Sequence, residues 1–263
     1  MVAMTNIRPP AVAGVFYPDN AGQLAQDVRQ LLAGVKLYEI TPKALIVPHA
    51  GYIYSGAIAA TGYATLQPLA AKIKRVVLLG PTHRVAVHGL ALPGAVIFET
   101  PLGQVKLDTV AVQKISHLPQ VVISEEAHAL EHSLEVQLPF LQSVLPEFKL
   151  LPLAVGMTSA ESVAEVLEYV WGDEETLIVV SSDLSHYLPY ATSQQVDYAT
   201  VQSILKLQQP IAHDLACGGT PISGLIIAAD KHQLTPHLLD LRNSGDTAGS
   251  RDQVVGYAAI AFG

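Results

Sequence analysis

The stretch Pro48-His49-Ala50-Gly51-Tyr52-Ile53-Tyr54-Ser55-Gly56 lies between the aliphatic run Ala44–Val47 and a run of small residues, 57–66. The aliphatic run is short and bounded by prolines, which predicts a buried strand, and the small residues after the stretch predict a helix. His49 is therefore expected just past the C-terminal end of a strand. In open α/β sheets ligands bind at this edge, and glycines let the backbone bend and approach a ligand closely.

The same arrangement of an aliphatic run followed by chemically active side chains recurs twice along the chain. The runs 75–80 and 176–180 are each predicted to be buried strands. The polar residues that follow the three strands are His49, His83, Asp183 and His186. The ends of parallel strands meet at one edge of a sheet, where imidazoles and a carboxylate could hold a metal or transfer protons. The residues alone leave open a structural role, in which these side chains bond loop backbones.

Aliphatic strands alternate with helical patterns along the whole chain, which predicts a three-layer α/β/α sandwich with a mostly parallel or mixed sheet. We find no linker or repeat, so residues 1–263 are expected to form one domain. The strands expected in the sheet are 44–47, 75–80, 150–156, 176–180, 236–241 and 254–262. Pro152 favours an edge position or a bulge for the strand that contains it.

The composition excludes several classes of protein. Half of the 263 residues are hydrophobic and 14% are charged, which supports a sizeable core. A net charge of −8 argues against a nucleic-acid-binding protein, which would need an excess of positive charge. The apolar runs are broken well before the length of a membrane span. The first ten residues lack the apolar core of a signal peptide, and a single cysteine, Cys217, fits a reducing cytoplasm.

The chain carries a specific set of segments in order. They are Ala13–Pro18, Pro48–Tyr52, Gly80–His83, Glu131–Pro139, Ser181–His186, Cys217–Ile222 and Val255–Ala259. Together they span nearly the whole chain and resemble the successive motifs of the Memo family. The prokaryotic branch of that family is named as protein B of the AmmeMemoRadiSam set, and the animal branch is named for a role in receptor-driven cell motility. The resemblance implies association with radical-SAM and AMMECR-type proteins.

The resemblance also implies a fold shared with the class III extradiol dioxygenases, which bind non-haem Fe(II) through two histidines and a carboxylate. In the Memo family the corresponding site is two histidines and a cysteine, which carries over to His49, His83 and Cys217. Such a set suits Fe(II) first and also Cu or Zn. Cys217 precedes an expected helix, whose dipole favours the thiolate. The residues implied to line the same pocket in catalytic roles are His132, Asp183 and His186.

The function that the resemblance implies is metal handling or redox chemistry on a small molecule, in which case the protein would be a non-haem iron oxidoreductase. A rival hypothesis comes from His128-Ala129-Leu130-Glu131-His132, which matches the inverted zincin pattern of a hydrolase. This hypothesis needs both histidines on one face of a helix, expected over 125–145 and interrupted at Pro139. Because only His132 belongs to the family motif, we expect His128 to be dispensable and His132 to face the pocket.

A non-enzymatic hypothesis is that the same pocket binds phosphopeptides, as animal Memo proteins are described to do. Phosphate is recognised by a guanidinium fork or by a nest of backbone N–H groups. Arg84 is the one obvious cation near the expected site. The ligand chemistry of two imidazoles and a thiolate therefore favours a metal over a phosphate.

Overall fold

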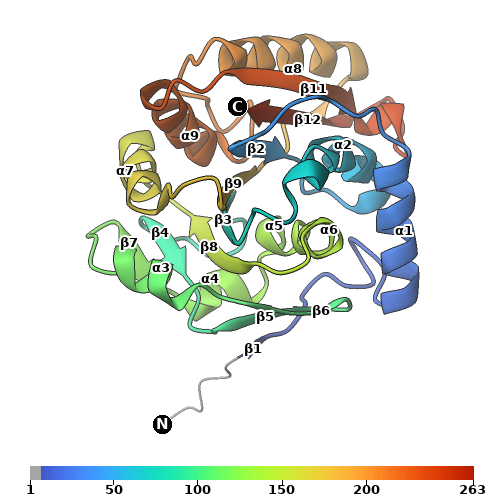
Figure 1. Cartoon of the computed structure of the whole chain (residues 1–263). Helices are drawn as coiled ribbons and strands as arrows, with labels where there is room; N and C mark the ends of the chain where they lie inside the picture. The colour runs from blue at the N-terminus through green and yellow to red at the C-terminus, as the bar shows by residue number, and fades with distance from the viewer. Residues whose placement is uncertain (1–6) are drawn as a thin grey trace.

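A nine-stranded mixed sheet runs through the centre of the molecule in the computed structural model, which describes residues 7–263 (Figure 1). Its strands follow the order β10-β12-β2-β9-β3-β8-β4-β7, and β11 pairs with β12. The strands are β2 (Ala44–Val47), β3 (Arg75–Pro81), β4 (Leu90–Leu92), β7 (Val121–Ile123), β8 (Lys149–Val155), β9 (Thr176–Ser181), β10 (His186–Leu188), β11 (Pro236–Asn243) and β12 (Val254–Phe262). The neighbours β2, β9, β3 and β8 are parallel, whereas β12 and β4 join them in antiparallel pairs.

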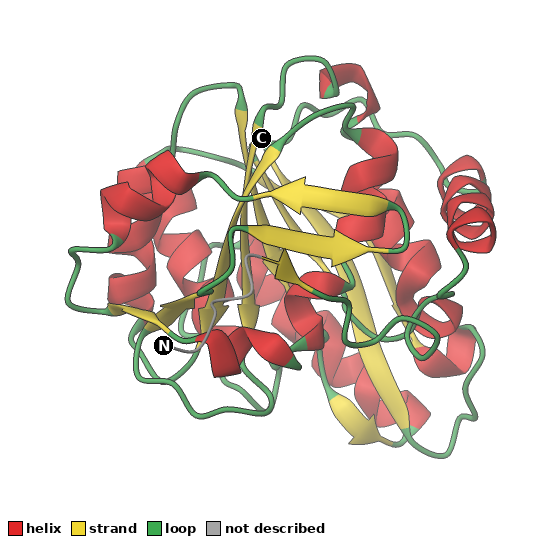
Figure 2. Ribbon diagram, turned by 90° about the horizontal axis from the view of Figure 1, so that it is seen from below, coloured by secondary structure: helices red, strands yellow, loops and turns green. Residues whose placement is uncertain are grey.

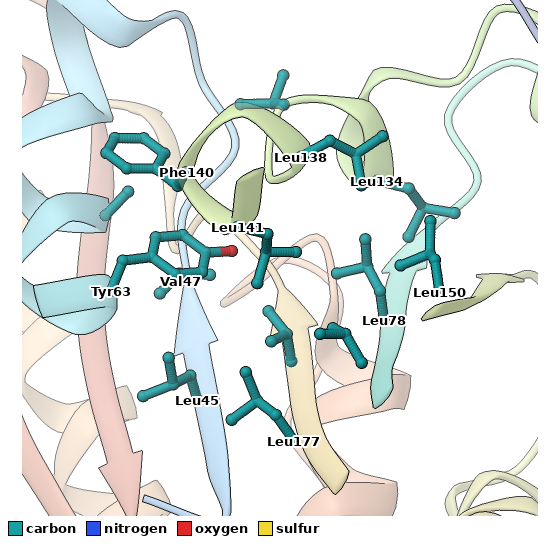
Figure 3. Close-up of a cluster of buried hydrophobic side chains, with 14 of the residues drawn as sticks. Leu45, Val47, Tyr63, Leu78, Leu134, Leu138, Phe140, Leu141, Leu150 and Leu177 are labelled. Carbon is teal, nitrogen blue, oxygen red and sulfur yellow. The ribbon is translucent and has the colours of Figure 1, made fainter. Parts of the chain in front are cut away.

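Helices cover both faces of this sheet (Figure 2). Along each central strand, alternate residues point to opposite faces. Leu45, Leu78 and Leu177 pack with Tyr63 and Phe140 in one buried cluster (Figure 3). The helices on that face are α1 (Ala21–Ala33), α2 (Tyr52–Ala64), α5 (His132–Glu135) and α6 (Leu138–Val144).

The neighbouring positions in the same strands belong to a second cluster on the other face. Ile46, Val77 and Ile178 pack there with residues of the remaining helices. These helices are α3 (Thr109–Ile115), α7 (Ala160–Val170), α8 (Tyr190–Leu205) and α9 (Gly219–Lys231). Both faces of the central strands are thus buried, and the predicted three-layer α/β/α fold with a mixed sheet is confirmed. That residues 1–263 form a single domain stays a prediction.

A small second sheet and several short elements complete the chain. The small sheet has the order β1-β5-β6, in which β1 (Ile7–Arg8) is parallel to β5 (Ile97–Thr100) and β6 (Gly103–Lys106) is antiparallel to it. The other short elements are α4 (Glu125–Ala129), η1 (Gln67–Leu69) and η2 (Ser244–Asp246). Among residues 7–263, we find no helix that combines the length and the apolar character of a membrane span.

The helix expected over 125–145 with an interruption at Pro139 is wrong, because the segment forms the three short helices α4, α5 and α6, with breaks at other positions. The chain turns extended at Glu131, whose side chain accepts a hydrogen bond from the backbone N–H of Ser133 and so caps α5. Pro139 lies in the first turn of α6, where the missing N–H costs nothing, rather than interrupting a helix.

The edge position expected for the strand around Pro152 is also wrong, because β8 lies between β3 and β4. Strand β4 pairs with Val155 and Ala154 only, so it ends before it reaches Pro152. Pro152 is tolerated there because one side of β8 has no partner strand at that point of the described chain.

Candidate functional site

Three adjacent strands bring the first site residues together. His49 follows β2, Asp183 follows β9 and His83 follows β3, and these strands are neighbours in the order β2-β9-β3. All three side chains therefore lie at the C-terminal edge of the parallel part of the sheet, as the sequence predicts. The ring centroids of His49 and His83 are 5.2 Å apart, with the rings nearly perpendicular.

A third imidazole reaches this edge from the helical layer above it. His132 is the first residue of α5, and its ring centroid lies 4.6 Å from that of His83 and 5.4 Å from that of His49. Helix α5 can approach β3 because residue 80 is glycine: a Cβ there would lie 2.8 Å from the hydroxyl of Ser133. One ligand atom from each of the three histidines lies within 4.8 Å of the others.

A chain of buried hydrogen bonds fixes the tautomer of His49. Ser181 donates its one hydroxyl proton to the carbonyl oxygen of Ser133 at 2.6 Å, so the hydroxyl can only accept from its other neighbours. Gln137 donates to this hydroxyl at 2.7 Å, and its own carbonyl accepts from Tyr63. The Nδ1 of His49, 2.9 Å from the same hydroxyl, must therefore carry a proton. It follows that Nε2 of His49 carries a lone pair, and the Sγ of Cys217 lies 3.3 Å from it.

Glu131 orients the other two imidazoles. Its carboxylate accepts from Nδ1 of His83 at 2.9 Å and lies 3.4 Å from Nδ1 of His132. It also accepts from the backbone N–H groups of His83 and Ser133. Sequence reasoning assigned Glu131 only to the zincin hypothesis and missed this role. The signal was its place directly before His132 in the family motif.

The surroundings lower the pKa values of His49, His132 and Glu131, which keeps the two imidazoles neutral and the carboxylate ionised. Burial lowers the pKa of His49 well below its usual value, and the neighbouring imidazoles lower it further. Burial also lowers the pKa of His132 to about 4, although the charge of Glu131 opposes the shift. Burial alone would raise the pKa of Glu131, but hydrogen bonds from His83 and Ser133 bring it to about 2. Neutral imidazoles with free lone pairs are the form that binds metals.

The three histidines line one cavity of about 640 Å³. Its walls carry aromatic rings, and its polar side chains include Asp183 and His186. The aromatic residues of the lining are Phe16, Tyr54, Tyr187 and Tyr257. Within residues 7–263, neither arginine nor lysine belongs to this lining. The cavity therefore suits a small, uncharged or cationic aromatic molecule better than a phosphate group.

Cys217 contacts one of the three histidines, His49. Its Sγ lies 3.3 Å from Nε2 of His49 and 3.6 Å from the carbonyl oxygen of Asp183. It does not join the group in which every donor lies within 4.8 Å of every other. Burial, reinforced by the charge of Asp183, raises the pKa of Cys217 to about 12. Without a bound metal, burial thus outweighs the helix dipole that was expected to favour the thiolate.

Asp183 is a buried carboxyl group that lines the cavity. It accepts a hydrogen bond from the backbone N–H of His49 at 2.7 Å, and its side chain is 5% exposed. Burial raises the pKa of Asp183 to about 7, although hydrogen bonds from the N–H groups of His49 and Ala50 oppose the shift. A carboxyl group with this pKa can hold or release a proton near neutral pH.

The structure separates the two histidines of the inverted zincin pattern. His128 lies at the end of α4 and its Nε2 donates to the carbonyl oxygen of Ala91 at 2.8 Å. It lines a different cavity from His132 and is outside the group of convergent donors. The zincin hypothesis is not supported, because the chain breaks at Glu131 and the two histidines belong to different helices rather than to one helix face.

The tautomers in this site can be tested by long-range ¹H–¹⁵N NMR of metal-free protein. We expect the imidazoles of His49 and His83 to carry their proton on Nδ1, because Ser181 and Glu131 accept from these atoms. The Gln137→Leu variant is expected to leave the His83 signal unchanged. A proton found on Nε2 of His49 in the wild-type protein would contradict the hydrogen-bond chain described above.

The fold and the site define an α/β protein with a pocket of three imidazoles at the C-terminal edge of a mixed sheet. A family model described as a Memo-like protein matches residues 8–261. A MEMO1 family protein from Aquifex aeolicus is 37% identical over 269 residues, covering 97% of this chain and 99% of the relative. One from Methanosarcina barkeri is 35% identical over 271 residues, with the same coverage. The chain belongs to the Memo family.

A solved structure supports the fold alone. The crystal structure of an uncharacterised protein from Escherichia coli K12 matches this chain with a TM-score of 0.56 and 14% sequence identity. The match covers 85% of this chain and 100% of the other. At this identity the likeness carries no information about activity.

Proposed function

We propose that this protein holds a transition metal at His49 and His83, with Fe(II) foremost and Cu or Zn as alternatives. The observation that carries the proposal is that a hydroxyl or a carboxylate engages Nδ1 of each imidazole, which leaves both Nε2 lone pairs for a common ion. Metal-bound histidines in proteins almost always have their second nitrogen bonded in this way. The site residues therefore fit a metal.

A bound metal of this kind would supply Lewis acidity or electron transfer, with positions open to a small molecule. The residues of the chain would do the rest. Asp183 and His186 would hold or move a proton at the cavity wall. The aromatic walls would bind an apolar or aromatic substrate and exclude bulk water. The proposed activity is thus metal handling or redox chemistry on a small molecule.

Two side chains are candidates for a third donor. The Cys217 thiolate is the donor that the family resemblance implies, and its Sγ lies 3.3 Å from Nε2 of His49. The His132 imidazole has a donor atom within 4.8 Å of one on each of the other two histidines. Association with radical-SAM and AMMECR-type proteins and a cytoplasmic location are further parts of the proposal. Phosphopeptide binding has less support, because the buried carboxyl group of Asp183 faces the cavity and would repel a phosphate when ionised.

Anaerobic titration of the protein with Fe(II) tests the metal centre. Wild-type protein is expected to bind with a dissociation constant far below about 1 mM, which corresponds to roughly −4 kcal/mol. The His49→Ala and His83→Ala variants are expected to bind more weakly than that limit, because each loses a donor. His128→Gln serves as the matched control, since His128 lies outside the cluster.

Wild-type binding weaker than about 1 mM would remove the basis for a metal centre. Loss of Fe(II) in His128→Gln with full binding in His49→Ala would revive the inverted zincin hypothesis. Tight binding of a phosphotyrosine peptide by metal-free protein would transfer support to the peptide-binding hypothesis.

A further inference from the structure

We propose that a second cavity, at the opposite edge of the sheet from the imidazoles, binds an organic phosphate, that is, a small molecule that joins phosphate groups to an apolar or aromatic part. The cavity has a volume of about 970 Å³. Its lining includes Arg75 and Lys149, the first residues of β3 and β8, and Glu175, which precedes β9. The cavity therefore lies where these parallel strands begin, whereas the imidazole pocket lies where parallel strands end, and the two sites are separate.

Positive charge is concentrated in this cavity, which is lined by four cations and three carboxylates. The whole chain, by contrast, has 15 basic residues and 23 acidic ones. The cations of the lining are Lys74, Arg75, Lys106 and Lys149, and the carboxylates are those of Asp108, Glu147 and Glu175. A cavity with more cations than carboxylates, in a protein that is negative overall, raises the local concentration of small anions.

The three lysines of the lining have no acidic partner within the chain. Among the ion pairs of residues 7–263, none includes Lys74, Lys106 or Lys149. Arg75 is committed to Asp108, whose carboxylate lies 2.6 Å from its Nε. The three ammonium groups are therefore available to a ligand, and an ammonium group is a frequent partner of phosphate in proteins.

The sheet register places two of the cations side by side. Arg75 and Lys149 are direct partners across the β3–β8 pair, and two unit charges at such a separation repel each other. Burial alone would raise the pKa of Asp108, but Arg75, the N–H of Ala111 and the charge of Lys149 bring it below its usual value. One buried carboxylate thus faces two cations. A bound anion would offset the remaining repulsion, which explains why the charges are kept together.

The cavity also has an apolar wall, which an inorganic ion would leave unused. Val105 and Leu145 are buried there, and Leu102 and Phe148 are partly buried beside them. The volume falls within the range of about 300–1,000 Å³ that is typical of small-molecule sites. The combination of an apolar wall with free ammonium groups therefore fits a phosphate compound that carries a ring or another apolar part.

Isothermal titration calorimetry of the full chain tests this proposal, with ADP, pyrophosphate and adenosine as probes. EDTA is present so that no metal ion can link a phosphate to the imidazole pocket. We expect ADP to bind with a dissociation constant below about 1 mM, pyrophosphate to bind more weakly, and adenosine to show no binding. The double variant Lys106→Gln/Lys149→Gln is expected to bind ADP about 10- to 100-fold more weakly, because two charge-assisted contacts are lost. Lys206→Gln, at the end of α8 and outside the cavity, is the matched control.

Salt provides a measurement that needs no variant. Raising NaCl from about 0.05 M to about 0.5 M is expected to weaken ADP binding several-fold, because the added ions screen the lysines. No binding of either ADP or pyrophosphate would overturn the proposal, and so would an equal loss in Lys206→Gln. Loss of ADP binding in His83→Gln would place the phosphate at the imidazole pocket instead. Pyrophosphate that binds as tightly as ADP would exclude a role for the apolar wall, and a hexaglutamate peptide that binds more tightly than ADP would assign the cavity to an acidic protein segment.

Discussion

Replacing Glu135 with Gln is expected to lower the free energy of unfolding by about 3–5 kcal/mol, the cost of breaking a buried ion pair from one side. The carboxylate of Glu135 is fully buried and accepts hydrogen bonds from Arg8 and Tyr17. It also accepts from the backbone N–H groups of Ala11 and Val12, at 2.8 Å and 3.0 Å. A glutamine amide in its place would point its own N–H group at groups that are themselves donors. It would also leave the charge of Arg8 without its counter-ion.

Urea denaturation followed by circular dichroism measures this loss, with the m-value as a check on two-state unfolding. The matched control is Glu174→Gln, which removes one partner of the surface pair with Lys72. That pair is 3.5 Å long and its side chains are 86% and 62% exposed, so a change within about 0.5 kcal/mol is expected. A loss below about 1 kcal/mol in Glu135→Gln would show that water or a rearrangement replaces the carboxylate.

The Glu135 variant also has an expected effect on the site. The segment that Glu135 fastens carries Phe16, whose ring centroid lies 4.8 Å from that of His132. The backbone oxygen of Phe16 accepts a hydrogen bond from the backbone N–H of Tyr52, which lies three residues after His49. Release of this segment would open the cavity on the side of His132, so weaker Fe(II) binding is expected in the folded fraction of the variant.

Replacing Gly80 with Ala is expected to cost about 1–3 kcal/mol of stability, the usual price of overpacking, and to weaken metal binding about 10- to 100-fold. The new methyl group would lie 2.8 Å from the hydroxyl of Ser133 and 3.0 Å from Leu134. Because α5 rests directly on β3 at this point, the helix must move outward. His132 and the cap residue Glu131 would move with it, away from His49.

The matched control for this prediction is Gly94→Ala, where the nearest atoms to a new Cβ are at 3.6 Å, an ordinary contact. Thermal unfolding measures the stability of both variants, and anaerobic Co(II) titration measures their affinity. Full affinity in Gly80→Ala, despite a lower midpoint of unfolding, would mean that the position of α5 does not set the metal site. That result would count against His132 as a ligand.

The sequence by itself determined the layers of the fold and most of the site residues at the C-terminal edge of the sheet. The runs 44–47, 76–79 and 177–180 are aliphatic at every position, because both faces of these strands are buried, and that pattern is local. Each run ends in a polar motif, so the convergence of His49, His83 and Asp183 followed from the rule that parallel strands end at one edge. The motifs also indicated the family.

Only the tertiary structure decided which side chains complete the cluster. Residues 125–145 have a helical pattern, yet the chain breaks at Glu131 because its carboxylate caps α5 and bonds His83, which is 48 residues away. Nothing local in the sequence reveals such a partner. The same holds for the tautomer of His49, which depends on Ser181 and Gln137 from two other elements. Hydrogen bonds between distant segments are set by packing, and packing is decided by the whole chain at once.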